Sequence, residues 1–283
     1  MTTRRRRVRQ LQVGGGAGWV TDELAAEEPL EIRLDGEPLS VTMRTPGADF
    51  DLTVGFLVTE GIIAGADAIA TMSMCPRAAD ASGEYNVVEV TLRRHRPDAA
   101  GARNFFMTSS CGVCGKASID AVRTRSEYAV SEDPLSVDPA LLATLPDALR
   151  AAQRMFTRTG GLHAAAIFNA AGDIMCVRED VGRHNAFDKV IGWAATQRLL
   201  PLTSHIILAS GRASFELTQK ALMAGIPLLA AVSAPSSLAV ELAEESGMTL
   251  VGFLRGERMN VYTGHHRVQS ASASSPRALS TGP

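Results

Sequence analysis

The strongest constraint on the fold of this chain is the alternation of strand patterns and helix patterns between residues 164 and 254. Such alternation is typical of layered α/β architecture. The patterns predict, in order, strands at 164–168 and 174–177, a helix at 185–198, a strand at 205–209, a helix at 214–224, a strand at 227–232, a helix at 236–246 and a strand at 249–254. We expect the last strands to be parallel, which brings the loops 210–212 and 233–237 to one carboxyl edge of the sheet.

The N-terminal half predicts a smaller α+β unit. Residues 30–43 alternate apolar and polar side chains around Asp35-Gly36, a turn pair typical of a β-hairpin. Residues 49–61 have helix-like apolar spacing and end on glycine, and residues 85–93 alternate again as a strand. The spacing of leucines over residues 138–156 predicts an amphipathic helix that leads into the α/β part.

Composition sets the expected domain boundaries. Residues 1–18 are basic and then glycine-rich, and residues 265–283 are poor in apolar side chains and lack periodicity, so we expect both ends to be disordered. Between them we expect a small α+β domain over residues 19–130 and an α/β domain over residues 131–264.

Charge and hydropathy exclude several classes of protein. With 46% hydrophobic and 20% charged residues and a mean hydropathy of +0.06, the chain resembles a soluble globular protein. Five arginines between Arg4 and Arg9 leave a net charge of −7 on the remainder of a chain whose total is −2. No apolar signal segment follows these arginines, and Gly225, Pro227 and Pro235 break the one long apolar stretch, so we expect a cytoplasmic protein with no membrane partner. We expect no nucleic-acid partner either, because no aromatic side chains are interleaved with the arginines.

The sharpest local motif is Cys111-Gly-Val-Cys114-Gly115. Its glycines predict a mobile loop over residues 107–117. The pair could supply half of a zinc site completed by His163 or His184, act as a redox pair, or carry sulfur as a persulfide. The alternative without chemistry is a solvent-exposed turn whose thiols have no function. The residues alone do not decide between these interpretations.

Further groups in the sequence are suited to anion binding. His163 follows a glycine pair and lies at the start of a predicted strand. Arg183 lies at the start of a predicted helix, and Ser210, Gly211 and Arg212 follow another predicted strand. Helix N-termini together with arginines form phosphate sites. A packed core histidine, a solvated helix start and serine caps are the structural alternatives. No GxGxxG, Walker A or nucleophile-elbow motif occurs in the chain.

Taken together, six motifs resemble the FdhD/NarQ family of formate dehydrogenase accessory sulfurtransferases. The matching segments, which span about residues 20 to 264, are 52–63, 111–115, 159–163, 179–189, 210–212 and 251–253. The resemblance implies a cytoplasmic, homodimeric sulfurtransferase that takes sulfur from a cysteine desulfurase. It implies delivery of that sulfur to the molybdenum of bis-molybdopterin guanine dinucleotide, a bound client rather than a permanent cofactor, for formate dehydrogenase.

The resemblance also assigns residues. It implies that Cys111 carries the persulfide with Cys114 as its partner, and that the client cofactor binds at Phe253, Leu254, Arg255, Gly256, Glu257 and Arg258. We expect the edge groups Ser210, Gly211, Arg212, His163 and Arg183 to hold the cofactor as well, and we expect no resident metal.

The family's second domain is similar in fold to cytidine deaminases, which raises deamination as a rival activity. A zinc deaminase needs H-x-E followed by P-C-x-x-C. Here Ala164 and Ala165 follow His163, and the cysteine pair precedes the histidine without a proline, so the sequence argues against deamination. The remaining alternative is a nucleotide-binding or cofactor-binding module with a structural zinc at the cysteine pair and no sulfur transfer.

Overall fold

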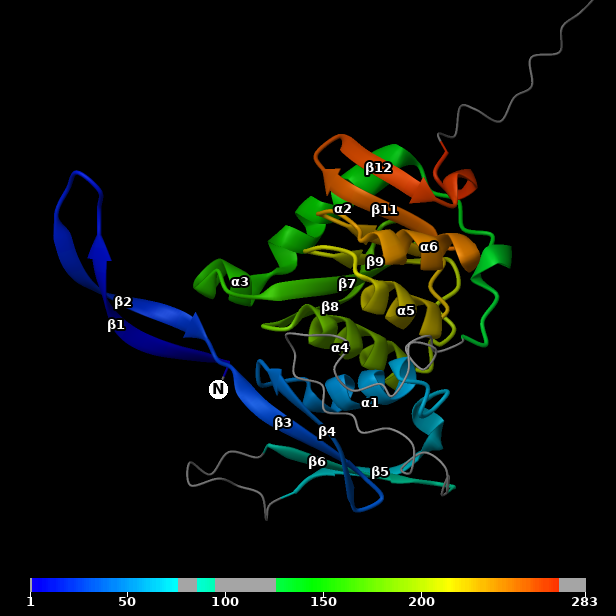
Figure 1. Ribbon diagram of the computed structural model, residues 1–283, viewed down its shortest axis with the longest axis horizontal. Helices are drawn as coiled ribbons and strands as arrows, with labels where there is room; N and C mark the ends of the chain where they lie inside the picture. Colours follow the sequence, from blue (N-terminus) through cyan, green and yellow to red (C-terminus); the bar gives the residue numbers. More distant parts are fainter. Residues whose placement is uncertain (1, 76–85, 95–125, 270–283) are drawn as a thin grey trace, which may run out of the picture.

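The computed structural model describes residues 2–75, 86–94 and 126–269 of the chain. Its strands form a six-stranded sheet, a four-stranded sheet and a two-stranded ribbon. Figure 1 shows the two larger sheets on opposite sides of a helical layer, with the ribbon projecting away from both. Among the helices of these residues, none is long and apolar enough to cross a membrane. The mixed α/β class predicted from the sequence is confirmed.

The six-stranded sheet has the order β12-β11-β10-β9-β7-β8. Its strands are β7 (His163–Asn169), β8 (Ile174–Asp180), β9 (His205–Ala209), β10 (Leu228–Ala231), β11 (Thr249–Arg255) and β12 (Arg258–Thr263). Strands β9, β10 and β11 pair in parallel, as predicted, and the other pairs are antiparallel.

Helices cover both faces of this sheet. Ile207 and Ala209 of β9 join the core under α4 (Arg183–Thr196), α5 (Phe215–Met223) and α6 (Ser237–Glu245). The alternate residues Ile206 and Leu208 join a second core under α2 (Pro139–Ala152). The period-2 alternation of a strand buried on both faces therefore produces two cores.

The N-terminal unit is a four-stranded sheet of order β4-β3-β6-β5 packed on α1 (Asp49–Thr59). The strands are β3 (Glu28–Leu34), β4 (Glu37–Arg44), β5 (Ile69–Met74) and β6 (Val87–Leu92), and a 3₁₀ turn at Ala66–Ala68 precedes β5. The predicted hairpin is confirmed: Asp35 and Gly36 have φ of 50° and 89°, the left-handed conformations that a tight hairpin turn requires. Strand β5 was not predicted.

Two glycines allow α1 and α4 to cross closely. A Cβ added at Gly55 would lie 1.8 Å from the Asp188 carbonyl oxygen, and one at Gly192 would lie 1.8 Å from the Asp51 carbonyl oxygen. One continuous hydrophobic core runs from Leu30 in β3 through this crossing to the six-stranded sheet. The domain boundary expected near residue 130 stays a prediction, although the two units share a core.

The disorder expected for the chain ends is wrong where the structure describes them. Strands β1 (Thr3–Leu11) and β2 (Ala17–Ala25) pair antiparallel over nine residues, because backbone pairing does not need the apolar alternation that the sequence lacks there. At the other end, a 3₁₀ turn at His265–Arg267 is held by buried Arg267, which donates to the carbonyls of Val130 and Gly247 at 2.6 and 2.8 Å. Residues 270–283 lie outside the described residues.

Candidate functional site

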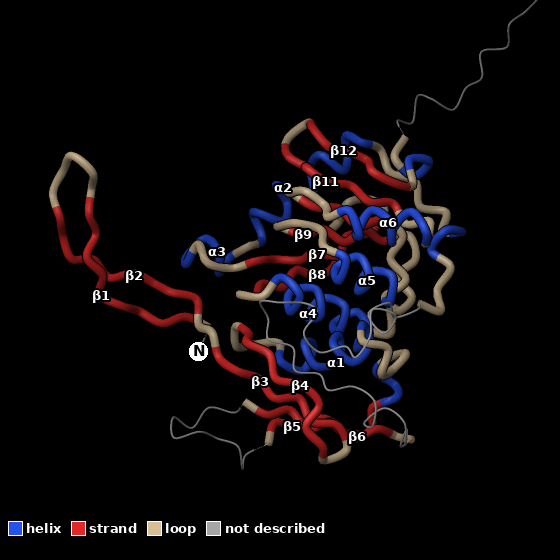
Figure 2. The backbone as a smooth tube through the Cα atoms, viewed as in Figure 1, coloured by secondary structure: helices blue, strands red, loops and turns tan. Residues whose placement is uncertain are grey.

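The carboxyl edge of the six-stranded sheet gathers the predicted site residues. Strands β8, β9, β10 and β11 end at this edge and β7 begins there, as the pairing of His163 with Asp180 and of Ala165 with Ala209 requires. Because α4, α5 and α6 each follow one of these strand ends, their N-termini point to the same edge (Figure 2). Helix N-termini carry partial positive charge and unpaired N–H groups, which suit an anion.

His163 is placed by a helix break that sequence periodicity did not show. The helix predicted over 138–156 ends at Ala152, and α3 (Arg154–Thr159) starts a new axis. The Glu179 carboxylate accepts from the N–H groups of Met155 and Phe156 at 2.9 and 2.7 Å, which caps α3 and favours the break. Gly160, with φ of 65°, then turns the chain into β7 and His163.

The His163 ring is half-buried, which governs its protonation. Burial lowers the pKa of His163, and the neighbouring Arg183 and His184 lower it further. The ring is therefore a neutral imidazole at pH 7, with one nitrogen free to accept a hydrogen bond.

The start of α4 and the start of α5 form the most unusual cluster. His184 Nε2 lies 3.8 Å from Glu216 Oε2, too far for a hydrogen bond but close enough for an ion pair. The His184 ring is the main cause that lowers the pKa of Glu216 to about 2. Arg183 Nε, His184 Nε2 and Ser214 Oγ are buried atoms with no hydrogen-bond partner among the described residues. Buried polar atoms are normally satisfied, so these donors are suited to a ligand.

The loop after β9 carries Ser210, Gly211 and Arg212 into the site. The Ser210 hydroxyl accepts from the Ala164 N–H at 2.8 Å, and a Cβ at Gly211 would lie 3.4 Å from His163 Nδ1. Arg212 is exposed. The structure thus places this loop beside His163.

The Phe253–Arg258 turn lies at the same edge but farther along it. Phe253 has φ of 52° and is 42% exposed, whereas the Leu254 side chain is fully buried in the core. Arg255 Nε donates to the Val232 carbonyl at 2.8 Å, and Gly256, Glu257 and Arg258 are exposed at the turn between β11 and β12. Three strand spacings separate β11 from β7, roughly 14 Å. The structure therefore places the turn and His163 on one edge without contact between them.

From the sequence, His184 was expected only as a possible zinc ligand, and Ser214 and Glu216 were not expected in the site. The run of charged and polar residues from Arg178 to Asn185 did not distinguish His184 from its neighbours as an anion-binding residue. His184 lies beside Glu216, 32 residues later, because β8 and β9 run in the same direction and α4 and α5 each follow one of them. The periodicity of the sequence does not predict this contact.

The cysteine pair Cys111 and Cys114 lies outside the described residues. Of the two cysteines inside them, Cys75 is partly buried and Cys176 is buried. Burial raises the pKa of the Cys176 thiol to about 12, which leaves it without thiolate character at neutral pH. The described part of the chain contains no group of three or more His, Cys, Asp or Glu side chains that could hold a metal ion.

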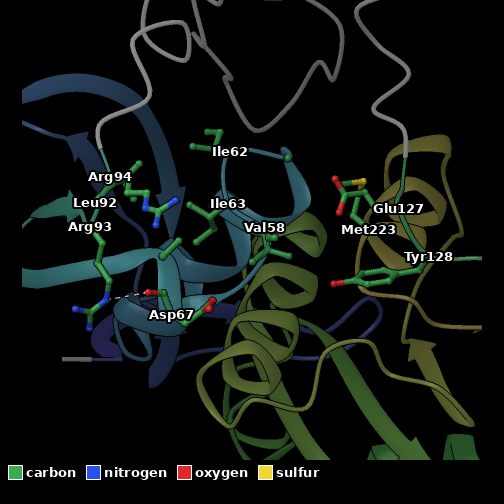
Figure 3. A pocket seen from close by; sticks show the side chains of 13 residues that line it. Val58, Ile62, Ile63, Asp67, Leu92, Arg93, Arg94, Glu127, Tyr128 and Met223 are labelled. Atoms are coloured by element: carbon green, nitrogen blue, oxygen red, sulfur yellow. Dashed lines mark hydrogen bonds between the residues drawn. The ribbon is translucent and has the colours of Figure 1, made fainter.

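A cavity of about 600 Å³ lies at the other end of the molecule, near the last turns of α1 and α5. Figure 3 shows Arg93 and Arg94 on one side of it and Glu127, Tyr128 and Met223 on the other. Arg94 and Glu127 stand next to the two ends of the segment 95–125, which contains the cysteine pair. The cavity is therefore distinct from the carboxyl edge and lies beside the residues at which the described chain stops and resumes around that segment.

Comparison with known proteins shows the family of this chain. The sulfur carrier protein FdhD of Streptomyces avermitilis is 57% identical over 275 residues, covering 96% of this chain and 97% of that protein. The protein of the same name from Mycobacterium tuberculosis is 57% identical over 253 residues, covering 87% and 92%. A crystal structure is also similar to this chain: that of a protein from Desulfotalea psychrophila described as a candidate formate dehydrogenase accessory protein. The TM-score is 0.71 at 23% sequence identity, and the match covers 95% of this chain and 100% of that chain, which shows a shared fold. The model of the FdhD/NarQ family matches residues 25–269, and the chain belongs to this family.

Proposed function

We propose that this chain is a sulfur carrier that serves formate dehydrogenase. It takes sulfane sulfur from a cysteine desulfurase and delivers it to the molybdenum of bis-molybdopterin guanine dinucleotide, its client cofactor. The name that the curated relatives share supports the sulfur-carrying role, and the accessory role described for the Desulfotalea protein supports the link to formate dehydrogenase.

Cys111 is the proposed sulfur acceptor. Its thiolate attacks the outer sulfur of the persulfide on the desulfurase, the S–S bond of the donor breaks, and the donor leaves as a thiolate. Cys111 then holds the sulfur as a persulfide, with no net oxidation or reduction. When the outer sulfur is delivered, the S–S bond of the persulfide breaks and Cys111 returns to the thiolate; the sulfur, which leaves at the level of elemental sulfur, becomes sulfide by taking two electrons from the reduced molybdenum of the client. Cys114 can share or resolve the persulfide.

The carboxyl edge supports binding of the client's phosphates. Three helix N-termini converge there, and Arg183 Nε, His184 Nε2 and Ser214 Oγ are buried polar atoms without a hydrogen-bond partner in the described part of the chain. This convergence is the observation that carries the proposal, because dinucleotide phosphates match both the charge and the hydrogen-bonding need. Arg212 and the Phe253–Arg258 turn extend the surface along which a guanine dinucleotide can lie.

The chain is long enough for the cysteines to serve both ends of the molecule. Ser126 comes twelve residues after Cys114, and an extended chain of that length spans at most about 40 Å. The nine residues of α5, which runs from the carboxyl edge toward the cavity, cover about 14 Å. Sulfur uptake beside the cavity and delivery at the edge are therefore compatible with one carrier segment.

Three further expectations belong to this proposal. The protein acts as a homodimer, it works in the cytoplasm, and its six-stranded unit is similar in fold to cytidine deaminases. None is needed for the persulfide chemistry at Cys111.

A cellular experiment separates the sulfur carrier from a zinc-stabilised binding module. Cys111→Ser is introduced into a strain that lacks the native protein, with Cys176→Ser as the matched control at a buried thiol. The proposal predicts that formate dehydrogenase activity is lost with Cys111→Ser and kept with Cys176→Ser, while purified Cys111→Ser stays folded. An unfolded Cys111→Ser protein that has released zinc would favour the binding module instead.

A further inference from the structure

The ribbon of β1 and β2, here called the arm, is a large feature that the proposed function does not use. It leaves the body on the side of α3, the helix that leads into His163 (Figure 1). A Cβ added at Gly161 would lie 4.0 Å from the Ala25 Cβ at the base of the arm, and Arg158 of α3 forms an ion pair with Glu23. The arm therefore rises from the margin of the carboxyl edge.

The register of the arm gathers arginines and a tryptophan on one face. Arg9 lies directly opposite Trp19, and Arg7 lies opposite Thr21. Side chains two residues apart on a strand share a face, so Arg5 belongs to the same face. The Arg7 guanidinium lies over the Trp19 ring, 5.1 Å from its centroid. This face, here called the arginine face, presents three cations around one aromatic ring.

The arginine face is open to solvent. Trp19 is 62% exposed, and the three arginines around it are exposed as well. With that exposure the indole adds little apolar burial to a two-stranded ribbon, which is itself marginally stable in water. The run of arginines has no aromatic residue of its own in the sequence, and β2 supplies one by pairing with it. The arginine face thus has the properties of a binding surface.

A guanine nucleotide matches both kinds of group on this face. Nucleic-acid bases stack on aromatic side chains and on guanidinium planes, and an indole beside an arginine offers both. Phosphate oxygens accept paired hydrogen bonds from arginine. Arg5 and Arg9 lie on either side of Arg7, each about 6.6 Å from it along the strand. They are within reach of the phosphates of a nucleotide whose base stacks on Trp19.

Charge favours a short anion over a long one. The arm carries a formal charge of +3, from five arginines, Asp22 and Glu23, which leaves −5 on the rest of the chain. A nucleic-acid strand that ran on from the arm over the body would meet this net negative charge. A dinucleotide is short enough to stay on the arm and on the basic groups of the carboxyl edge.

We propose that the arginine face of the arm binds one of the two guanine nucleotides of the client, while the carboxyl edge holds the other. The client has two guanine dinucleotide halves that meet at one molybdenum, so two nucleotide sites set apart suit its shape. Trp19 lies six residues before Ala25, which places the indole roughly 20 Å from the margin of the edge. The inference rests on the client cofactor of the proposed function, to which it adds a second nucleotide site.

Guanosine diphosphate (GDP) is the probe, and the number of molecules bound per full-length chain is the measurement. Isothermal titration calorimetry compares the wild type with Trp19→Ala, Arg7→Gln and the matched control Arg6→Gln. Arg6 is next to Arg7 but belongs to the opposite face, where it lies across from Asp22. We expect two GDP molecules per chain for the wild type and for the control. Trp19→Ala and Arg7→Gln should each raise the Kd of one of the two sites at least about tenfold.

Tryptophan fluorescence assigns the weakened site to the arm. The chain has two tryptophans, and Trp193 is partly buried in α4. A guanine stacked on an indole quenches its emission, so GDP should quench the wild type and Trp193→Phe but not Trp19→Ala. Arg183→Gln, at the carboxyl edge, should weaken the other site and leave the quenching of Trp19 in place. Far-UV circular dichroism confirms the fold of each variant.

Every contrary outcome overturns the inference in a distinguishable way. One GDP per chain, weakened by Arg183→Gln and unaffected by Trp19→Ala, removes the arm from the site and leaves client binding at the edge intact. Two sites that neither arm variant weakens place the second nucleotide elsewhere. No binding at millimolar GDP contradicts the client of the proposed function as well.

Two further results would reassign the arm. An equal loss with Arg6→Gln and Arg7→Gln shows a general effect of charge and contradicts a site on the arginine face. A single-stranded oligonucleotide that binds the wild type more tightly than GDP does, and that Arg7→Gln no longer binds, assigns the arm to nucleic acid instead of the client.

Discussion

Lys220 is a buried cation that ties α5 to both α1 and α4. Its Nζ donates to Asp188 Oδ1 and Oδ2 at 2.8 and 2.9 Å and to Thr59 Oγ1 at 2.9 Å, and Glu60 Oε1 lies 3.7 Å away. All four residues are at most 5% exposed. Burial alone would lower the pKa of Lys220, but Asp188 and Glu60 outweigh it, so the pKa is raised and the lysine stays charged. The ammonium group therefore compensates the charge of these buried carboxylates.

Lys220→Met removes the cation and leaves the Asp188 carboxylate buried beside an apolar side chain. Removal of one partner from a buried ion pair costs about 3–5 kcal/mol, out of a total stability of about 5–15 kcal/mol for a typical domain. Because burial already raises the pKa of Asp188, the variant can relieve the cost by protonating this carboxyl. A raised carboxyl pKa makes the native state bind the extra proton, so the loss of stability grows as the pH rises and shrinks as it falls.

Urea unfolding followed by circular dichroism at about pH 8 and about pH 5 measures both effects. We expect Lys220→Met to lose about 3–5 kcal/mol at the higher pH and clearly less at the lower one, and the double variant with Asp188→Asn to recover at least about 2 kcal/mol. Arg198→Met, at an exposed arginine, is the control and should change little. A loss below about 1 kcal/mol, or a loss independent of pH, would refute the account of this buried pair.

Three further predictions follow from the described residues. Iodoacetamide at neutral pH should leave Cys176 unmodified in the native protein, because burial raises its pKa to about 12; peptide mass spectrometry that finds it alkylated before unfolding contradicts this. Gly192→Ala should lower the free energy of unfolding by about 1–3 kcal/mol, since its Cβ would meet the Asp51 carbonyl, and an unchanged urea midpoint argues against the close crossing. His163 has a lowered pKa, so its contribution to stability is present above about pH 6.5 and is lost as the pH falls through the folded-state value. His163→Asn should therefore flatten the acid limb of a pH series of urea melts, and parallel curves for the two proteins would show that the burial argument fails.

The order of strands and helices in the second half was predictable because each element has a clear local pattern. Strands buried on both faces give continuous apolar runs, as in His205–Ala209, and the helices between them have amphipathic spacing. The first hairpin was predictable because Asp35-Gly36 is a strong turn signal. Elements that lack burial were not: β1 and β2 are strands held by backbone pairing, with hardly any buried side chain to produce alternation.

The candidate site was predictable only in part for the same physical reason. His163, Arg183 and the Ser210–Arg212 loop follow strand ends or helix starts, and topology brings such positions to one edge. The break between α2 and α3 depends on the Glu179 carboxylate, which is distant in sequence from the amides it caps. Likewise, nothing near His184 in the chain indicates that Glu216 stands beside it.

The central claim is that Cys111 carries sulfur, and intact-protein mass spectrometry tests it most directly. The purified protein is incubated with a cysteine desulfurase and cysteine, beside Cys111→Ala and beside a sample treated with reductant. The account predicts a gain of one sulfur atom that reductant removes and that Cys111→Ala does not acquire. No gain in the wild type, or an equal gain in Cys111→Ala, would contradict the assignment of this cysteine as the sulfur carrier.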